Sequence, residues 1–213
     1  MIRVGLTIGK SARFNPILTL RGHGRPMKVG AQREVLDAVN ARAKAAGWTF
    51  VCGLAHDFTH PALNAALALW RDKAAGRAMP LRSEMTARAM KPFMPNMSLL
   101  ERIDSGGGRR YRVRLHGSAL ARYSGDNTGR FLDDFVAPER MGGYLGIYDA
   151  VLQLQIPLRV VSHYQAPEID YLTGESLVAP LAVPGSNTPV ILSVTYARAR
   201  GDLRSISLGH RVA

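Results

Sequence analysis

The residues of this chain that could do chemistry form no complete catalytic or metal-binding pattern. "GLTIGKS" (5–11) resembles a phosphate-binding loop, but such a loop needs four residues between its glycines and only three stand here. His56 and His60 have the i,i+4 spacing of metal ligands on one helix face. Thr59 and Pro61 predict, however, that a helix begins between them, so the two rings need not share a face. We therefore expect neither a phosphate site nor a metal site.

The acidic and nucleophilic candidates also stand without catalytic partners. Asp133 and Asp134 are adjacent, so their side chains point in different directions and suit helix capping or solvent better than paired acid–base catalysis. Ser118, Ser124 and Ser176 belong to no G-x-S-x-G nucleophile elbow. We expect no catalytic residue, and hence no enzyme.

Composition predicts one domain with a proper hydrophobic core. The chain has 213 residues, of which 46% are hydrophobic, and a chain of this length buries roughly 70% of its unfolded surface. Cys52 is the only cysteine, which excludes an internal disulfide and fits a reducing compartment. No apolar run approaches the ~20 residues of a membrane span, and the N-terminus lacks a signal-peptide core. We expect a soluble, cytoplasmic protein.

The net charge of +12 is concentrated near the N-terminus. Residues 1–50 contain nine Lys or Arg against two acids. Residues 1–30 have no helical or strand period, and we expect them to form a flexible basic arm, with Met27 as an alternative start. Nucleic acids and anionic membrane surfaces attract such charge. An adaptor for one of these is our second hypothesis, ranked lower because few aromatic residues accompany the arginines of the arm.

Two helices and one ambiguous segment are predicted in the first half of the chain. Apolar spacing predicts a helix over residues 31–46, ended by Gly47. The apolar "WTFVCGL" (48–54) is too short to assign. Ser83 can cap a short helix that Pro92 ends.

A further helix, between these two, is marked more clearly. Thr59 is the predicted N-cap, Pro61 lies in the first turn and Gly76 ends the helix. Its apolar stripe consists of Leu63, Leu67, Trp70 and Ala74.

After Pro95 the pattern changes to strands. "SLLERID" and "RRYRVRLHG" (109–117) are two strands joined by an "SGGG" turn. Short helical pieces follow over 118–135, and then a longer helix over about 139–155. Three more strands are predicted in "PLRVVSHYQ", "ESLVAPLAV" and "PVILSVTYAR". This order predicts an α+β fold: one antiparallel five-stranded sheet with helices packed on one face.

This order of elements resembles a PAS domain, and three blocks of sequence strengthen the likeness. "LWRDKAAGRAMPLRSEM", "YRVRLHGSALARYSGDNTGRFLDDF", and "LVAPLAV" followed by "VILSVTYAR" are similar to blocks of stand-alone bacterial PAS proteins. The resemblance covers roughly residues 64–198. It implies a helical extension and lead-in over 31–95, a PAS core over 96–200 and a tail over 201–213. It also implies a pocket between the sheet and its helical insertion, with signalling through dimer or partner contacts.

The resemblance leaves the cofactor unassigned. "GDNTGRFLDDF" is similar to a stretch of flavin-binding light sensors that carry a cysteine just ahead of "RFL", where Thr128 and Gly129 stand here. No cysteine follows Cys52, so we do not expect a flavin–cysteine adduct. Heme-binding PAS domains usually supply a histidine from the long helix, and residues 139–155 contain none. His116 and His163 are weaker ligand candidates, and flavin or heme bound by other contacts stays open.

Strand alternation and the helical insertion suggest a pocket and an interface. Arg112 and Arg114 alternate with apolar residues, so one face of their strand is apolar and the other basic. We expect the two arginines at a homodimer or partner interface covered by the helix over 31–46. The protein is then a non-enzymatic sensory or regulatory module that binds an unidentified small molecule or a partner signalling protein. The predicted pocket residues are Tyr111, Val113, Leu115, Tyr123, Phe131, Tyr148 and His163.

Overall fold

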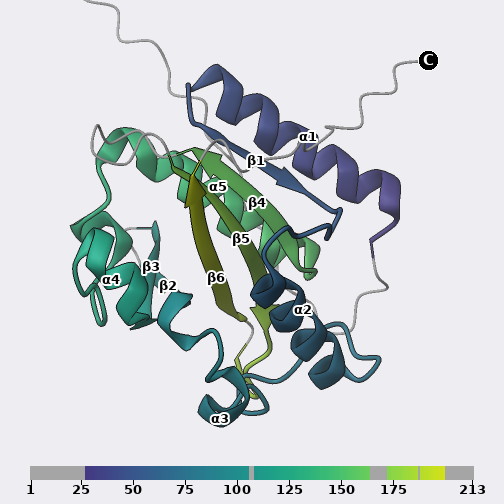
Figure 1. Ribbon diagram of the computed structural model, residues 1–213. Coiled ribbons are helices and arrows are strands. Elements are labelled where there is room, and N and C mark those ends of the chain that lie inside the picture. The colour runs from purple at the N-terminus through teal and green to yellow at the C-terminus, as the bar shows by residue number, and fades with distance from the viewer. Residues whose placement is uncertain (1–26, 106–107, 164–171, 187, 200–213) are drawn as a thin grey trace, which may run out of the picture.

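A single antiparallel sheet of six strands organises the part of the chain that the computed structural model describes, which is residues 27–105, 108–163, 172–186 and 188–199 (Figure 1). Residues 1–26 of the predicted arm, the centre of the "SGGG" turn and the tail over 201–213 lie outside these ranges. The strand order is β1-β4-β5-β6-β2-β3. The strands are β1 (Phe50–Gly53), β2 (Met97–Ser105), β3 (Gly108–His116), β4 (Leu158–His163), β5 (Leu172–Leu181) and β6 (Val190–Ala199).

The α+β class is confirmed, and the strand count exceeds the prediction by one. The additional strand is β1, from the segment over 48–54 that periodicity left unassigned. It pairs antiparallel with β4 at the sheet edge, with Phe50 opposite Ser162 and Gly53 opposite Arg159. A four-residue strand is too short to show a period of its own. Its assignment therefore depends on a partner more than 100 residues away.

The helices fall close to their predicted positions, but two predicted caps are wrong. The helices are α1 (Val29–Ala45), α2 (Pro61–Ala74), α3 (Ala87–Met90), α4 (Ser118–Ser124) and α5 (Pro138–Leu154), with short 3₁₀ helices η1 (Met94–Asn96) and η2 (Leu132–Asp134). His60, not Thr59, caps α2, because its ring nitrogen accepts the Ala62 N–H. Thr86, not Ser83, caps α3 by accepting the Ala89 N–H.

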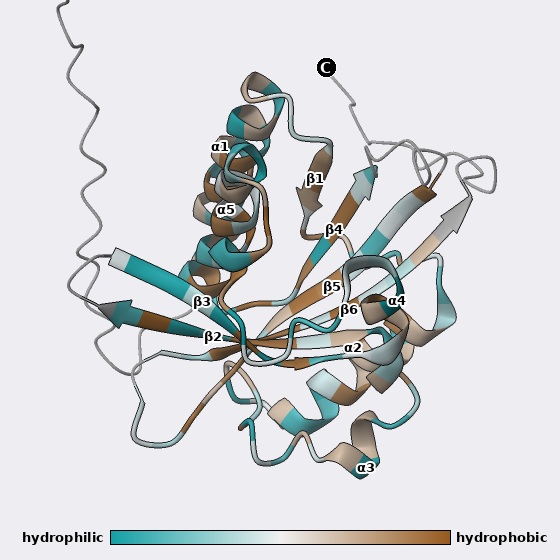
Figure 2. Ribbon diagram, turned by 90° about the vertical axis from the view of Figure 1, so that its left-hand side faces the viewer, coloured by the Kyte–Doolittle hydropathy of each residue, from teal (hydrophilic) through white to brown (hydrophobic). Residues whose placement is uncertain are grey.

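Helices cover both faces of the sheet (Figure 2), whereas the sequence predicted helices on one face only. On one face α2 packs its predicted stripe against β5 and β6, and the Trp70 Nε1–H donates to the Pro180 carbonyl at 2.9 Å. On the other face lies α5, the last helix of the insertion, with α1 against it and against β1. We predicted that the helix over 31–46 covers the arginine face of β3. That prediction is wrong, because α1 packs against β1, at the opposite edge of the sheet.

Two glycines on α5, Gly142 and Gly143, allow the segment that leads from α1 into β1 to approach closely. A Cβ on Gly142 would lie 2.5 Å from the Trp48 ring, and one on Gly143 would lie 3.0 Å from the Phe50 ring. The Trp48 Nε1–H donates to the Glu139 carbonyl at 2.8 Å, which ties the segment before β1 to the first turn of α5. This close packing forms one wall of the cavity described next.

Candidate functional site

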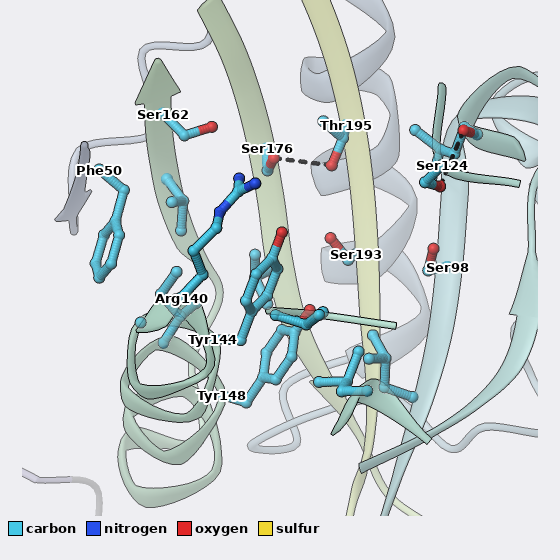
Figure 3. Close-up of a pocket in the computed structure, with 18 of the residues that line it drawn as sticks. Phe50, Ser98, Ser124, Arg140, Tyr144, Tyr148, Ser162, Ser176, Ser193 and Thr195 are labelled. Atoms are coloured by element: carbon cyan, nitrogen blue, oxygen red, sulfur yellow. Dashed lines mark hydrogen bonds between the residues drawn. The ribbon is translucent and has the colours of Figure 1, made fainter. Parts of the chain in front are cut away.

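A cavity of about 290 Å³ lies between the sheet and the helical insertion. Strands β2, β4, β5 and β6 form its floor, α5 forms one wall, and α4 with the start of β1 closes the sides (Figure 3). The cavity is apolar at one end, where its lining consists of the buried side chains of Leu100, Val113, Leu132, Ile147, Val160 and Val178.

The other end of the floor carries a row of hydroxyl groups. Side chains two apart on a strand share a face, so Ser193 and Thr195 of β6 both face the cavity, as does Ser176 of β5. Ser176 and Thr195 share a hydrogen bond of 2.8 Å across the two strands (Figure 3). Ser98 and Ser162 extend the row onto β2 and β4. Small polar residues here leave space above the sheet that larger apolar residues would have filled.

Helix α5 presents three hydrogen-bonding side chains to this cavity. Arg140, Tyr144 and Tyr148 are spaced four residues apart, so they follow one face of the helix (Figure 3). Over the described ranges, neither the Arg140 guanidinium nor the hydroxyl of either tyrosine has a hydrogen-bond or ion-pair partner in the protein. Tyr148 is buried, and burial, together with the nearby Tyr144, raises the pKa of its hydroxyl. A buried hydroxyl such as that of Tyr148 normally finds a partner in water or a ligand. Tyr144 is half-buried and Arg140 is exposed at the edge of the cavity.

A β-bulge brings His116 to the cavity. Leu99 pairs with Leu115 and Leu100 pairs with Val113, so Arg114 is an extra residue in β3. A bulge of this kind reverses the facing of the residues that follow it. Leu115 consequently packs in the core on the α2 side, whereas His116 borders the cavity.

The His116 ring joins three elements at the cavity wall. Its Nδ1 lies 3.0 Å from Ser98 Oγ of β2, and its Nε2 lies 2.9 Å from Ser124 Oγ of α4. Burial lowers the pKa of His116, and the nearby Asp126 carboxylate opposes that change. Both ring nitrogens are therefore already engaged within the protein.

Four of the seven predicted pocket residues border the cavity: Val113, Tyr123, Tyr148 and His163. Tyr123 is exposed at its mouth. His163 lies at the rim, and its Nδ1 is 3.0 Å from Thr173 Oγ1 on the neighbouring strand. That any of these residues binds a ligand stays a prediction.

The other three predicted pocket residues lie elsewhere. Tyr111 is fully buried below the cavity, and its hydroxyl donates to Asp149 Oδ1 at 2.9 Å. Phe131 packs against Arg110, whose guanidinium carbon lies 3.8 Å from the centre of the Phe131 ring. Leu115 is turned to the opposite face by the bulge. Simple alternation along β3 therefore fails beyond Val113.

Sequence reasoning missed Arg140, Tyr144 and the hydroxyl row. The signal for the helix residues was their i,i+4 spacing with Tyr148. The signal for the floor was the alternation of Ser193 and Thr195 within a strand that is otherwise apolar. Neither pattern indicates by itself that the space between these elements is empty.

The predicted interface arginines both have contacts within the chain. The Arg112 Nε–H donates to the Gly129 carbonyl at 3.2 Å, and Arg114 lies 3.6 Å from the Glu101 carboxylate. Arg114 is exposed. Their part in a dimer or partner interface stays a prediction.

The remaining motifs have structural contacts. Asp133 and Asp134 both pair with the Arg110 guanidinium. His56 contacts the Pro157 carbonyl at 3.0 Å, and His60 stacks on the Tyr196 ring. Within residues 27–199, apart from the gaps given above, no group of three or more His, Cys, Asp or Glu side chains could hold a metal ion. The helices in those ranges also include none that is long and apolar enough to cross a membrane.

Comparison with known proteins agrees with this architecture. A family model described as a PAS domain matches residues 58–195, which is more than half of the chain. The match runs from the loop before α2 to the last cavity residue of β6. No curated protein and no solved structure matches the chain.

Proposed function

The chain belongs to the PAS domain family, and on that premise we propose that it is a non-enzymatic sensory module that binds a small molecule in the cavity beneath α5. The observation that carries this proposal is a set of polar side chains at one end of the cavity that have no hydrogen-bond or ion-pair partner among the described residues. Arg140, Tyr144 and Tyr148 converge on a space whose other end is apolar. Apolar walls with a few convergent polar groups are typical of small-molecule sites.

The position of the cavity supports a sensory role. A ligand there contacts α5 and the sheet strands β4, β5 and β6 at the same time. It therefore favours whichever packing of helix against sheet gives it the better contacts, and this differential affinity shifts the population between two states. We propose that the shift is read by a partner signalling protein or by a second copy of the chain, through the arginine face of β3.

The test is a comparison of native and denatured masses of the purified full chain by mass spectrometry. We expect the native mass to exceed the chain mass by that of a small molecule, and the excess to disappear on denaturation. The same spectrum gives the number of subunits. A matched variant, Ser193→Phe, fills the cavity from the floor, and we expect it to lose the excess while it still unfolds cooperatively.

Two outcomes would contradict the proposal. One is a native mass equal to the chain mass in the wild type, with no stabilisation by any compound of a small-molecule panel. The other is an unchanged mass excess in Ser193→Phe, because the bound molecule would then lie outside the cavity.

A further inference from the structure

We infer that the ligand is a small organic monocarboxylate with an apolar body, held by Arg140 at the mouth of the cavity; this rests on the proposed function. Among the described residues that border the cavity, Arg140 is the only Lys, Arg, Asp or Glu. The lining therefore carries one full positive charge and no negative charge. A ligand with a single negative charge matches it.

The position of Arg140 strengthens the preference for an anion. Arg140 is the third residue of α5, and a cation in the first turn of a helix is disfavoured by the helix dipole. The amides of this turn are largely occupied, because Pro138 has no N–H and the Arg140 and Met141 amides both donate to the Ala137 carbonyl. Glu139 lies in the same turn, but no ion pair joins it to Arg140 within the described structure. The Arg140 guanidinium, and not the helix amides, is therefore the group available to an anionic ligand.

A carboxylate fits this end of the cavity better than a phosphate group does. A guanidinium binds a carboxylate through two parallel hydrogen bonds. The hydroxyls of Tyr144, Ser162 and Ser193 also border the cavity, and they have no hydrogen-bond partner in the described part of the chain. A phosphate ester carries about two negative charges at neutral pH, whereas Arg140 supplies the one full positive charge of the described lining.

The volume of the cavity and its apolar end determine the size and polarity of the rest of the ligand. An apolar cavity of about 150 Å³ accepts benzene, so the space of about 290 Å³ here corresponds to about ten to twelve non-hydrogen atoms. Figure 3 shows Arg140 extending from α5 to the level of Ser176 and Thr195, with Tyr144 and then Tyr148 farther along the helix. The carboxylate would lie among these polar groups, and the apolar body would lie toward Leu100 and Val178.

The test uses probes matched in shape and different in charge. Binding of 3-phenylpropanoate, 3-phenylpropan-1-ol and phenyl phosphate to the full chain is measured by isothermal titration calorimetry. We expect the carboxylate to bind at least tenfold more tightly than the alcohol or the phosphate. Arg140→Gln should remove that advantage and leave the affinity for the alcohol unchanged, while Arg140→Lys should retain part of it. The matched control is Arg33→Gln, which removes one positive charge from an exposed position on α1.

The outcomes separate this inference from the proposed function. An alcohol that binds as tightly as the carboxylate, or an Arg140→Gln variant with unchanged carboxylate affinity, overturns the monocarboxylate and leaves the small-molecule sensor intact. Tighter binding of phenyl phosphate overturns the choice of carboxylate. If none of the probes binds, the mass of the molecule released from the native protein decides: a neutral compound overturns the inference, and no compound at all overturns the proposed function as well.

Discussion

The side chain of Asn40 forms both hydrogen bonds that a neighbouring strand would otherwise offer to Cys52. Its Nδ2 donates to the Cys52 carbonyl at 2.9 Å, and its Oδ1 accepts the Cys52 N–H at 2.8 Å. Cys52 lies in β1, the edge strand of the sheet. An unpaired edge can recruit another chain. Helix α1 thus protects this edge, and a dimer formed by continuing the sheet beyond β1 is disfavoured.

Replacing Asn40 should therefore destabilise the fold. We expect Asn40→Ala to lower the free energy of unfolding by about 1–3 kcal/mol, because the amide and carbonyl of Cys52 lose their partners in a half-buried place. Urea unfolding followed by circular dichroism measures the change. Lys44→Ala, at an exposed position on the same helix, is the control and should change little. Equal stability of the two variants would show that the edge contacts contribute nothing.

Cys52 should be unreactive in the folded protein. Its side chain is buried, and burial raises the pKa of the thiol to about 12. Since the thiolate is the reactive form, we expect slow labelling by a disulfide reagent at pH 8 and rapid, stoichiometric labelling in urea. Asn40→Ala should label faster than the wild type, because it weakens the attachment of α1 to β1. Labelling of the native wild type at the rate of a small free thiol would contradict the burial.

Two glycine substitutions should have opposite effects. A Cβ on Gly117, between β3 and α4, would lie 2.3 Å from the Pro95 carbonyl oxygen and 2.4 Å from that of Met94. Backbone must then move, so we expect Gly117→Ala to cost about 3 kcal/mol. On α5 the nearest atom to a Cβ on Gly146 is Val39 Cγ1 at 3.9 Å, an ordinary contact.

The matched variant Gly146→Ala should therefore stabilise the protein by about 0.5–1 kcal/mol, since alanine favours a helix interior. Thermal unfolding of both variants provides the measurement. A gain in stability for Gly117→Ala would mean that the chain from Pro95 to Gly117 is packed less closely than the distances indicate.

Stability should decrease as the pH falls through the histidine range. Burial lowers the pKa of His116 and of His56 below the ordinary 6.5. At His116 the Asp126 carboxylate opposes the lowering of the pKa. At His56 the Pro157 carbonyl and Asp57 oppose the lowering, whereas the charge of Arg71 adds to it. As the pH falls, these two histidines therefore become protonated at a higher pH in the unfolded chain than in the folded protein. This contribution to stability is present above pH 6.5 and is lost as the pH falls from 6.5 toward the lowered values.

Urea unfolding at pH 7.5, 6.5 and 5.5 measures this effect. We expect the midpoint for the wild type to fall with pH, and the midpoint for His116→Gln to fall less steeply. This window lies above the range in which most carboxylates titrate, so their contribution is small. Parallel pH dependence in the two proteins would contradict the burial of the His116 ring.

Local patterns in the sequence determined the elements and the class of fold. The apolar spacing over residues 31–46, the stripe from Leu63 to Ala74 and the order of strands and helices after Pro95 each depend on neighbours a few residues apart. Such patterns follow from the periods of helix and strand and can be read without a partner. The sequence blocks that resemble PAS proteins predicted membership of the PAS family, and the match over residues 58–195 confirms it.

Only the tertiary structure decided which residues meet in the cavity. One extra residue in β3, Arg114, reverses the facing of Leu115 and places His116 beside Ser98 and Ser124. A bulge exists only in relation to the partner strand, so alternation within one strand cannot reveal it. The cavity is likewise a property of several elements together, because it arises where small hydroxyl side chains of the sheet face α5 and leave volume unfilled. Arg140 acquires a role in the proposed site because that volume opens beside it.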